Sequence, residues 1–197
     1  MARPREFDTD DAIRNAMSVF WEKGYQDASL PDLLEGMGLT RGSLYKAFKD
    51  KKTLFLLVLE HYEDAAVGAA QARLSDPGIP DGRDRILGLF EASAAVALEG
   101  DHRGCLLCTA AAGFEMSDPE IAAAVQQGLE GIRAGLETAL RASPVHHALD
   151  DAARRALANV LLTHYIGLRV LARSHLPLGA VETSVQGVAR LLEAQAA

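Results

Sequence analysis

The chain has 197 residues, of which 49% are hydrophobic and 6% aromatic, and its formal net charge is −7. This length suits one fair-sized domain or a small domain joined to a larger one, and the alanine-rich, aromatic-poor composition is typical of packed helices. No run is apolar enough to span a membrane, the start of the chain is too charged for a secretory signal, and two cysteines are too few for a disulfide framework. We therefore expect an all-helical, reduced, cytoplasmic protein with no membrane partner.

The first two predicted helices have clear start and stop signals. Residues 10–23 place apolar side chains on one helical face, and Gly24 is expected to end that helix. Ser29 is a suitable cap for a second, short helix over residues 30–37. Gly38 follows it, and glycine accepts the positive φ of a tight turn.

A third short helix, RGSLYKAF, follows with Thr40 as its expected cap and with Leu44 and Phe48 facing inward. Two short helices joined by a tight turn form a helix-turn-helix, whose second helix enters the major groove of DNA. A long fourth helix is predicted from Lys51 to Leu74, and its first amides favour a phosphate.

Charge is distributed unevenly along the chain. Four of the five lysines lie between residues 46 and 52. The segment through Thr53 has nine basic and nine acidic residues, whereas the remainder has eleven arginines and eighteen acidic residues. A polyanion would be repelled by the acidic part and could be bound only at the lysine-rich stretch. The alternative interpretation of this stretch is a solvated helix end.

The same region resembles the DNA-binding domain of TetR/AcrR-type transcriptional regulators. The resemblance covers about residues 5–60 and depends on RPREFD from Arg3, VFWEKGY from Val19, Ser29, MG at Met37, SLY at Ser43, Phe48 and Lys51. It implies an all-helical homodimer with a helix-turn-helix DNA-binding domain (residues 1–53) and a larger effector-binding and dimerisation domain (residues 54–197). It also implies double-stranded operator DNA and a small-molecule effector of unknown identity as partners.

The resemblance assigns DNA contacts residue by residue. The positions matching Tyr45 and Lys51 contact phosphates, and those matching Thr40 to Ser43 and Lys46 lie at or near the bases. Ala47 stands where the family often has a larger polar or aromatic residue, and Lys52 replaces a common acid, which is expected to raise non-specific phosphate affinity. The full predicted DNA-binding set is Ser29, Thr40, Arg41, Gly42, Ser43, Tyr45, Lys46, Lys49 and Lys51.

Beyond about Arg73 the resemblance ends, and only the helical pattern continues. A turn-rich linker spans residues 75–82, and SDPE at Ser117 is a strong helix start. The helix after it has a long apolar stripe, and the next, over residues 150–174, is apolar on two faces. Pro177 and Gly179 are expected to separate it from the last helix. His146 and His147 are expected to be solvated in a loop.

In the resembled family, the last two helices pair with their copies in a four-helix dimer interface. The alternative is an ordinary core within one chain. Readers of DNA of this type need two half-sites, which favours the dimer. The predicted interface residues are Leu157, Val160, Leu161, Leu168, Val185, Val188 and Leu192.

A candidate effector pocket is formed by aromatic and polar residues of the larger domain, although the same residues also suit a plain core. The candidates are Phe90, Cys105, Thr109, Phe114, His164 and Tyr165. Cys105 and Cys108 are open to three interpretations: small core residues, a redox or electrophile sensor, or metal ligands together with His102. A fourth metal ligand is missing, and no nucleophile motif or phosphate-binding glycine loop is present. We therefore predict no enzyme activity, no cofactor and no metal.

The function that these patterns favour is a homodimeric transcriptional regulator, a repressor released by a small molecule. One alternative is a regulator that responds to oxidation or electrophiles through Cys105. Another is a helical ligand-binding protein that does not bind DNA.

Overall fold

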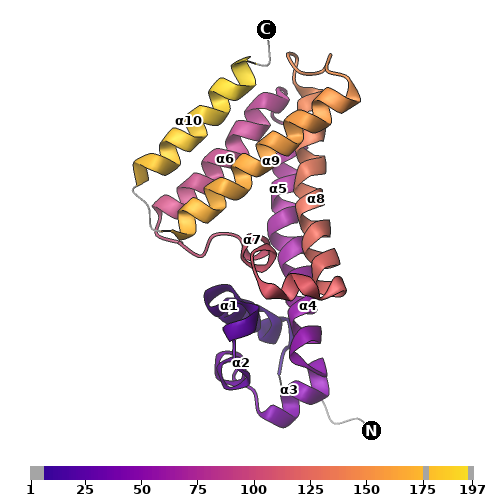
Figure 1. Cartoon of the computed structure of the whole chain (residues 1–197), viewed down its shortest axis with the longest axis vertical. Helices are drawn as coiled ribbons and strands as arrows, with labels where there is room; N and C mark the ends of the chain where they lie inside the picture. The colour runs from indigo at the N-terminus through magenta and orange to yellow at the C-terminus, as the bar shows by residue number, and fades with distance from the viewer. Residues whose placement is uncertain (1–6, 175–177, 195–197) are drawn as a thin grey trace.

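The computed structural model describes residues 7–174 and 178–194, so Arg3 to Glu6 of the resembled motif and Pro177 lie outside the described residues. The described chain is helical, with a small unit at one end and a larger bundle at the other (Figure 1). The α-helices are α1 (Thr9–Asp27), α2 (Leu30–Met37), α3 (Arg41–Phe48), α4 (Lys51–Tyr62), α5 (Gly68–Leu74), α6 (Gly82–Leu98), α7 (Leu106–Ala111), α8 (Pro119–Ala142), α9 (Asp151–Arg173) and α10 (Leu178–Ala194).

The small unit has its own aromatic core, in which α1 packs against α2 and α4. The rings of Phe20 and Phe55 meet edge to face with centroids 4.9 Å apart, and Tyr25 lies 4.7 Å from Phe55. Leu44 and Phe48 of α3 are buried against this core, as their spacing predicts. Burial of Leu44 and Phe48 fixes the opposite side of α3 toward the outside.

Helix α4 connects the two units. The predicted helix from Lys51 to Leu74 is present, but it is α4, a π-helical turn (Glu63–Val67) and α5 in succession. Wider turns of this kind are rare inside helices and often lie at functional sites. In Figure 1 this element runs from the small unit up into the bundle beside α8.

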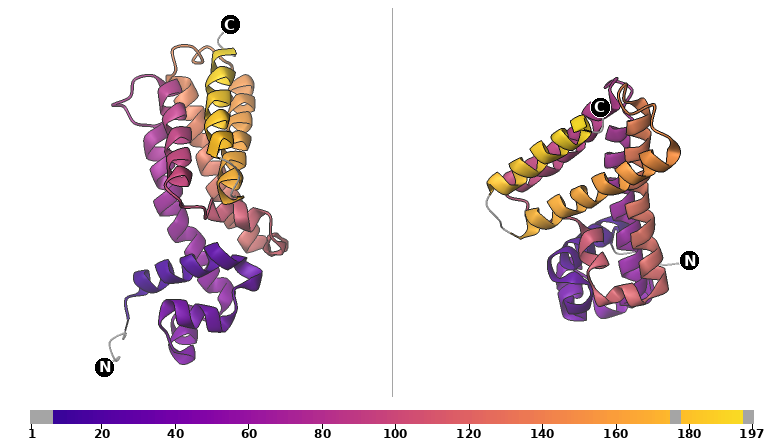
Figure 2. Two further views of the ribbon diagram at one scale, coloured as in Figure 1. Left: turned by 90° about the vertical axis from the view of Figure 1, so that its left-hand side faces the viewer. Right: turned by 45° about the horizontal axis from the view of Figure 1, so that its top comes forward.

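The larger unit is a layered helical bundle. Helix α8 packs against α5, α6 and α9, while α10 covers α6 and α9, as the two views in Figure 2 show. The apolar stripe predicted along α8 is buried at Ile121, Val125, Ile132, Leu136 and Leu140. Gly82 at the start of α6 lies so close to α8 that an added Cβ would be 1.7 Å from the Ala139 oxygen.

The expectation that both loop histidines are solvated is wrong for His146. His147 is exposed, but His146 is fully buried, with its Nδ1 3.0 Å from the Ser143 hydroxyl and its Nε2 3.1 Å from the Leu192 carbonyl oxygen. A carbonyl can only accept, so Nε2 carries the proton and Nδ1 accepts from the hydroxyl. His146 thereby joins the α8–α9 loop to α10.

Candidate nucleic-acid interface

The two short helices are fixed by side-chain caps and one left-handed glycine. The hydroxyl of Ser29 accepts a hydrogen bond from the amide of Asp32, whose carboxylate accepts one from the Ser29 amide at 2.9 Å. Gly38 ends α2 with φ 63°, and Thr40 caps α3 by accepting from the Ser43 amide at 3.3 Å. These three predicted signals are present, and together they set the direction in which α3 leaves the unit.

The outer face of α3 consists of hydrogen-bond donors and small residues. Exposed on it are Thr40, Arg41, Gly42, Tyr45, Lys46 and Lys49, with Ser43 partly exposed. The Arg41 guanidinium lies 5.7 Å from the centre of the Tyr45 ring. An added Cβ at Gly42 would meet nothing within 4 Å, so this face is open to a large ligand. Donors of these types suit guanine edges and phosphate oxygens.

Helix α3 ends in a strained turn at Lys49. The φ of Lys49 is 66° and its ψ is −60°, and the Asp50 amide donates to the Phe48 carbonyl at 2.7 Å. This is a γ-turn with positive φ, which is rare and costly for a residue with a side chain. Asp50 then caps α4 by accepting from the Thr53 amide at 2.7 Å. The turn brings the exposed Lys49 ammonium next to the N-terminus of α4.

Lys51 and Lys52 have different surroundings. The Lys51 ammonium lies 4.8 Å from the centre of the Tyr25 ring and donates to the Gln26 carbonyl at 3.2 Å, and its partial burial lowers its pKa. Lys52 is ion-paired with Asp118 at 2.7 Å and Glu120 at 3.3 Å. Lys52 is therefore engaged with the start of α8, and its expected contribution to phosphate affinity stays a prediction.

A connection that the sequence does not reveal joins the small unit to α9. Arg173, in the last turn of α9, donates to the main-chain oxygens of Trp21, Glu22 and Arg103. The Trp21 indole donates to the Arg103 oxygen at 3.0 Å, and the Arg103 guanidinium lies 4.5 Å from the indole centre. An open hollow of about 690 Å³ lies beside these residues. No local motif marks Arg173, since its partners are 70 or more residues away.

The candidate effector residues do not form one pocket. Phe90 and Tyr165 pack edge to face at 5.8 Å, and the Thr109 hydroxyl donates to the Cys105 carbonyl. Phe114, however, is 88% exposed at the turn before α8, and His164 is exposed on α9. The prediction is therefore wrong for these last two residues as pocket lining, because each points to solvent.

Most of the predicted dimer residues lie inside the chain's own core. Leu157, Leu161, Leu168, Val188 and Leu192 are buried between α9, α10 and their neighbours, whereas Val185 is partly buried and Val160 is 41% exposed. Side chains that are at most 6% exposed offer almost no surface to a second copy, so the five buried residues are corrected to core. Among the exposed residues of α9, an uncharged stripe consists of Ala156, Val160, Thr163, Gly167 and Val170, and the charged Asp151 and Arg155 are exposed near the start of the same helix.

Two negative observations concern the described residues. No helix among them is both long and apolar enough to cross a membrane. Within residues 7–174 and 178–194, no three His, Cys, Asp or Glu side chains gather as metal ligands would. His102 instead lies with its Nδ1 3.2 Å from the Ala172 oxygen.

A capped helix-turn-helix with a donor-rich second helix, carried on a larger helical unit, defines a class: DNA-binding transcriptional regulators. Residues 12–58 match the family profile of bacterial regulatory proteins of the tetR family. A cysteine mutant of the TetR family transcriptional regulator CifR, solved with 26-bp double-strand operator DNA, is 30% identical with a TM-score of 0.84, over 95% of this chain and 98% of that one. The chain belongs to the TetR family.

Other similar proteins agree with this placement. The uncharacterized regulator YezE of Bacillus subtilis is 32% identical over 62% of this chain and 62% of its own length. The repressor ComR of Escherichia coli is 42% identical over 36% of this chain and 34% of its own. These curated relatives are thus matched over less than two thirds of their length. The reduced form of Escherichia coli NemR, 23% identical with a TM-score of 0.78 over 91% of this chain and 93% of that one, shares the fold.

Proposed function

We propose that this chain is a homodimeric repressor that binds operator DNA in the cytoplasm and is released by a small-molecule effector. The observation that carries the proposal is the outer face of α3, where donors suited to bases and phosphates stand free of intramolecular ion pairs among the described residues. ComR, matched over 36% of this chain, is named a repressor, which supports repression rather than activation. Family membership argues against a helical protein that does not bind DNA.

The two units have separate roles in this proposal. Residues 1–53 read DNA, and residues 54–197 bind the effector and the second copy. Arg41 and Lys46 lie at base edges, while Tyr45, Lys49 and Lys51 contact phosphates. Thr40, Ser43 and the bare backbone at Gly42 allow α3 to approach the groove closely, and Ser29 presents the N-terminus of α2 to the DNA backbone.

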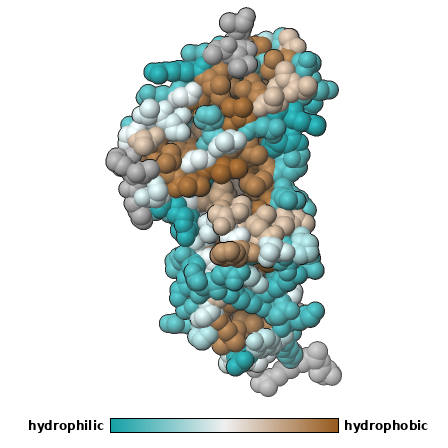
Figure 3. Space-filling model, viewed as in Figure 1, coloured by the Kyte–Doolittle hydropathy of each residue, from teal (hydrophilic) through white to brown (hydrophobic). Residues whose placement is uncertain are grey.

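The second copy is expected on the outer side of α9, over the uncharged stripe from Ala156 to Val170. This side lies next to α10, and apolar residues extend over both helices in the face shown in Figure 3. An added Cβ at Gly167 would meet nothing within 4 Å, so a partner helix can approach closely there. The two α3 helices of such a dimer would have to fit successive major grooves, about 34–36 Å apart.

Selection of bound sequences from random duplex DNA tests the proposal. We expect enrichment of two inverted half-sites whose centres are about one helical turn apart. A reporter gene placed behind the selected site should be repressed by the chain. Failure to enrich any sequence would contradict the proposed DNA-binding function. Enrichment of a single, unrepeated half-site would contradict the proposed dimer.

A further inference from the structure

The two cysteines lie together at the start of α7. Cys105 is the capping residue of that helix and Cys108 its third residue, so one helical turn brings their side chains to the same side. Hydrogen bonding with the Cys108 thiol is the main cause that lowers the pKa of Cys105, and burial opposes it. The same hydrogen bond raises the pKa of Cys108. Of the two thiols, Cys105 is therefore the one that ionises more readily.

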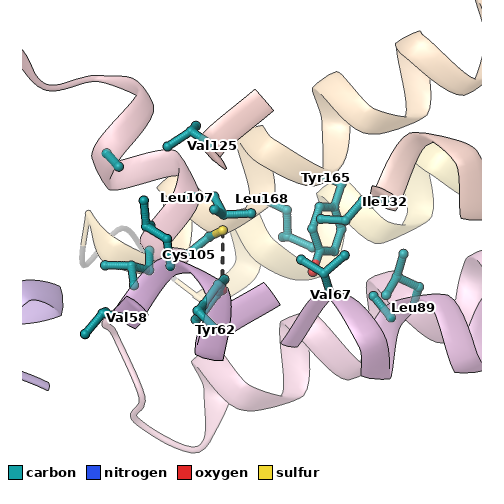
Figure 4. Close-up of a cluster of buried hydrophobic side chains, with 14 of the residues drawn as sticks. Val58, Tyr62, Val67, Leu89, Cys105, Leu107, Val125, Ile132, Tyr165 and Leu168 are labelled. Carbon is teal, nitrogen blue, oxygen red and sulfur yellow. Dashed lines mark hydrogen bonds between the residues drawn. The ribbon is translucent and has the colours of Figure 1, made fainter. Parts of the chain in front are cut away.

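Two further side chains support negative charge on Cys105. The Tyr62 hydroxyl from α4 lies 3.4 Å from the Cys105 sulfur, and Figure 4 shows this contact within the surrounding apolar cluster. Arg169 of α9 donates to the neighbouring Gly104 carbonyl, and its charge also lowers the pKa of Cys105. The Nε of Arg169 is buried without a hydrogen-bond partner in the part of the chain that the structure describes. A buried guanidinium facing phenol and thiol groups favours an anion at the sulfur.

The thiol pair is also close to the connection between the two units. The Tyr62 ring meets Trp21 of α1 edge to face at 5.1 Å. Gly104, directly before Cys105, has φ 73° and lies so close to α9 that an added Cβ would be 2.7 Å from the Arg169 oxygen. Arg103, the next residue back, accepts the Trp21 indole hydrogen bond. A change of bonding at Cys105 therefore acts on a tightly packed segment that holds α1.

We propose that Cys105 and Cys108 form a redox-active dithiol, which small hydroperoxides convert to an intramolecular disulfide that weakens operator binding. The Cys105 thiolate attacks the peroxide oxygen, the O–O bond breaks, and the alkoxide leaves and takes a proton as an alcohol. The Cys108 thiol then attacks the resulting sulfenic acid and displaces water. Two electrons pass from the two thiols to one peroxide, giving one disulfide, one water and one alcohol, or a second water in place of the alcohol when the oxidant is hydrogen peroxide.

Access to the pair selects small oxidants. Cys105 is 4% exposed, while Cys108 is partly exposed. An uncharged hydroperoxide therefore reaches the pair more readily than a bulky alkylating reagent. Disulfide formation shortens the distance between the sulfurs and removes the thiolate that Tyr62 and Arg169 stabilise. Both effects displace the segment from Arg103 to Cys105 against α1.

The chemical step is tested on the full-length reduced chain treated with hydrogen peroxide or tert-butyl hydroperoxide, then denatured, alkylated and weighed by mass spectrometry. We expect loss of two hydrogens and no alkylation in the wild type. Cys108→Ser should instead stop at a sulfenic acid that dimedone traps, and Cys105→Ser should remain reduced. Wild-type chain that stays fully alkylatable after treatment would overturn the proposal.

The regulatory step rests on the proposed function, and DNA binding of the reduced chain is its control. Oxidation should weaken operator affinity on the order of tenfold, a usual size for coupling between sites, and a dithiol reductant should restore it. Cys105→Ser should keep its affinity after peroxide, and thermal unfolding of the oxidised chain should show that it stays folded. A disulfide that leaves affinity unchanged contradicts the switch, whereas a reduced chain that binds no selected duplex contradicts the DNA-binding function itself.

Discussion

The Nη1 atom of Arg173 donates a hydrogen bond of 2.9 Å to the main-chain oxygen of Trp21, so the end of α9 holds the end of the first helical stretch of α1. Gly24, with φ 79°, breaks α1 just beyond this point. The last carbonyls before a helix break lack partners within the helix and carry partial negative charge. The guanidinium of Arg173, from the larger unit, therefore caps these carbonyls. It connects the DNA-binding unit to α9, the helix proposed to pair with a second copy.

Arg173→Ala should loosen the angle between the two reading helices of a dimer. We expect weaker binding to an operator of the selected half-site spacing, and a flatter dependence of affinity on that spacing. Arg173→Lys should have an affinity and a spacing dependence between those of the wild type and Arg173→Ala. The lysine keeps the charge, but its ammonium cannot reproduce the planar set of donors of a guanidinium. Arg141→Ala, at an exposed site at the end of α8, is the matched control. The dependence of affinity on spacing is measured by titrating each variant with operators of altered spacer length. If Arg173→Ala has the same dependence as the wild type, the contact between Arg173 and α1 does not set the angle between the reading helices.

Lys51→Ala should weaken binding to operator and to random duplex DNA by similar factors and reduce the salt slope by about one, because a phosphate contact carries no base information. Lys52→Ala should have a smaller effect on affinity, since Asp118 and Glu120 already engage its ammonium. Titrations at several salt concentrations separate the two variants. Equal losses in both would mean that the ion pair opens when DNA binds.

Lys49 lies in a conformation that glycine accepts without strain. Lys49→Gly should raise the free energy of unfolding by about 1 kcal/mol while lowering DNA affinity through loss of the charge. Lys49→Ala should lose the same affinity without the gain in stability, since alanine keeps the strain. Urea unfolding of both variants tests the predicted stabilities, and DNA titration tests the predicted affinities. Equal stabilities of the glycine and alanine variants would show that the turn relaxes in solution.

Arg41 or Lys46 is expected to read a base edge, because both are exposed on the outer side of α3. A bidentate contact of an arginine with guanine contributes roughly 1–3 kcal/mol of discrimination. The alanine variant of the reading residue should accept other bases at one operator position and leave the rest of the preference unchanged. If both variants select the wild-type sequence, neither side chain reads a base.

Val160→Glu should give folded monomers, because Val160 is exposed in the single chain and the glutamate would be desolvated only at an interface. Leu161→Glu should instead fail to fold, since Leu161 is fully buried within the chain. Sedimentation and thermal unfolding distinguish these outcomes. A stable dimer of Val160→Glu would place the pairing surface away from the outer side of α9.

Local signals in the sequence predicted most of the DNA-binding unit. Ser29, Gly38 and Thr40 act within a few residues of themselves, so their roles as cap and turn residues could be derived from neighbours alone. Periodicity likewise predicted the buried stripe of α8. It could not tell which apolar side of α9 meets the chain's own helices, because a core and a dimer interface have the same pattern.

The errors share a physical cause, which is contact between distant segments. His146 is buried because Leu192 supplies a carbonyl acceptor 46 residues later, and no property of the loop itself predicts that partner. The ion pair of Lys52, which no local signal in the sequence indicates, likewise depends on where α8 begins relative to α4. Arg173 has no local signal for the same reason, since its partners on α1 and at Arg103 are distant in the sequence. Phe114 was wrongly predicted as pocket lining because hydrophobicity alone does not determine burial.

The most direct test of the central claim, that α3 reads DNA sequence, is a fluorescence titration of the chain against its selected operator and against a shuffled duplex of the same composition. We expect operator binding at least about a thousandfold tighter than binding to shuffled DNA at physiological salt, with both affinities falling steeply as salt rises. Equal affinity for the two duplexes would contradict it, because the exposed side of α3 would then bind only phosphate and carry no sequence information.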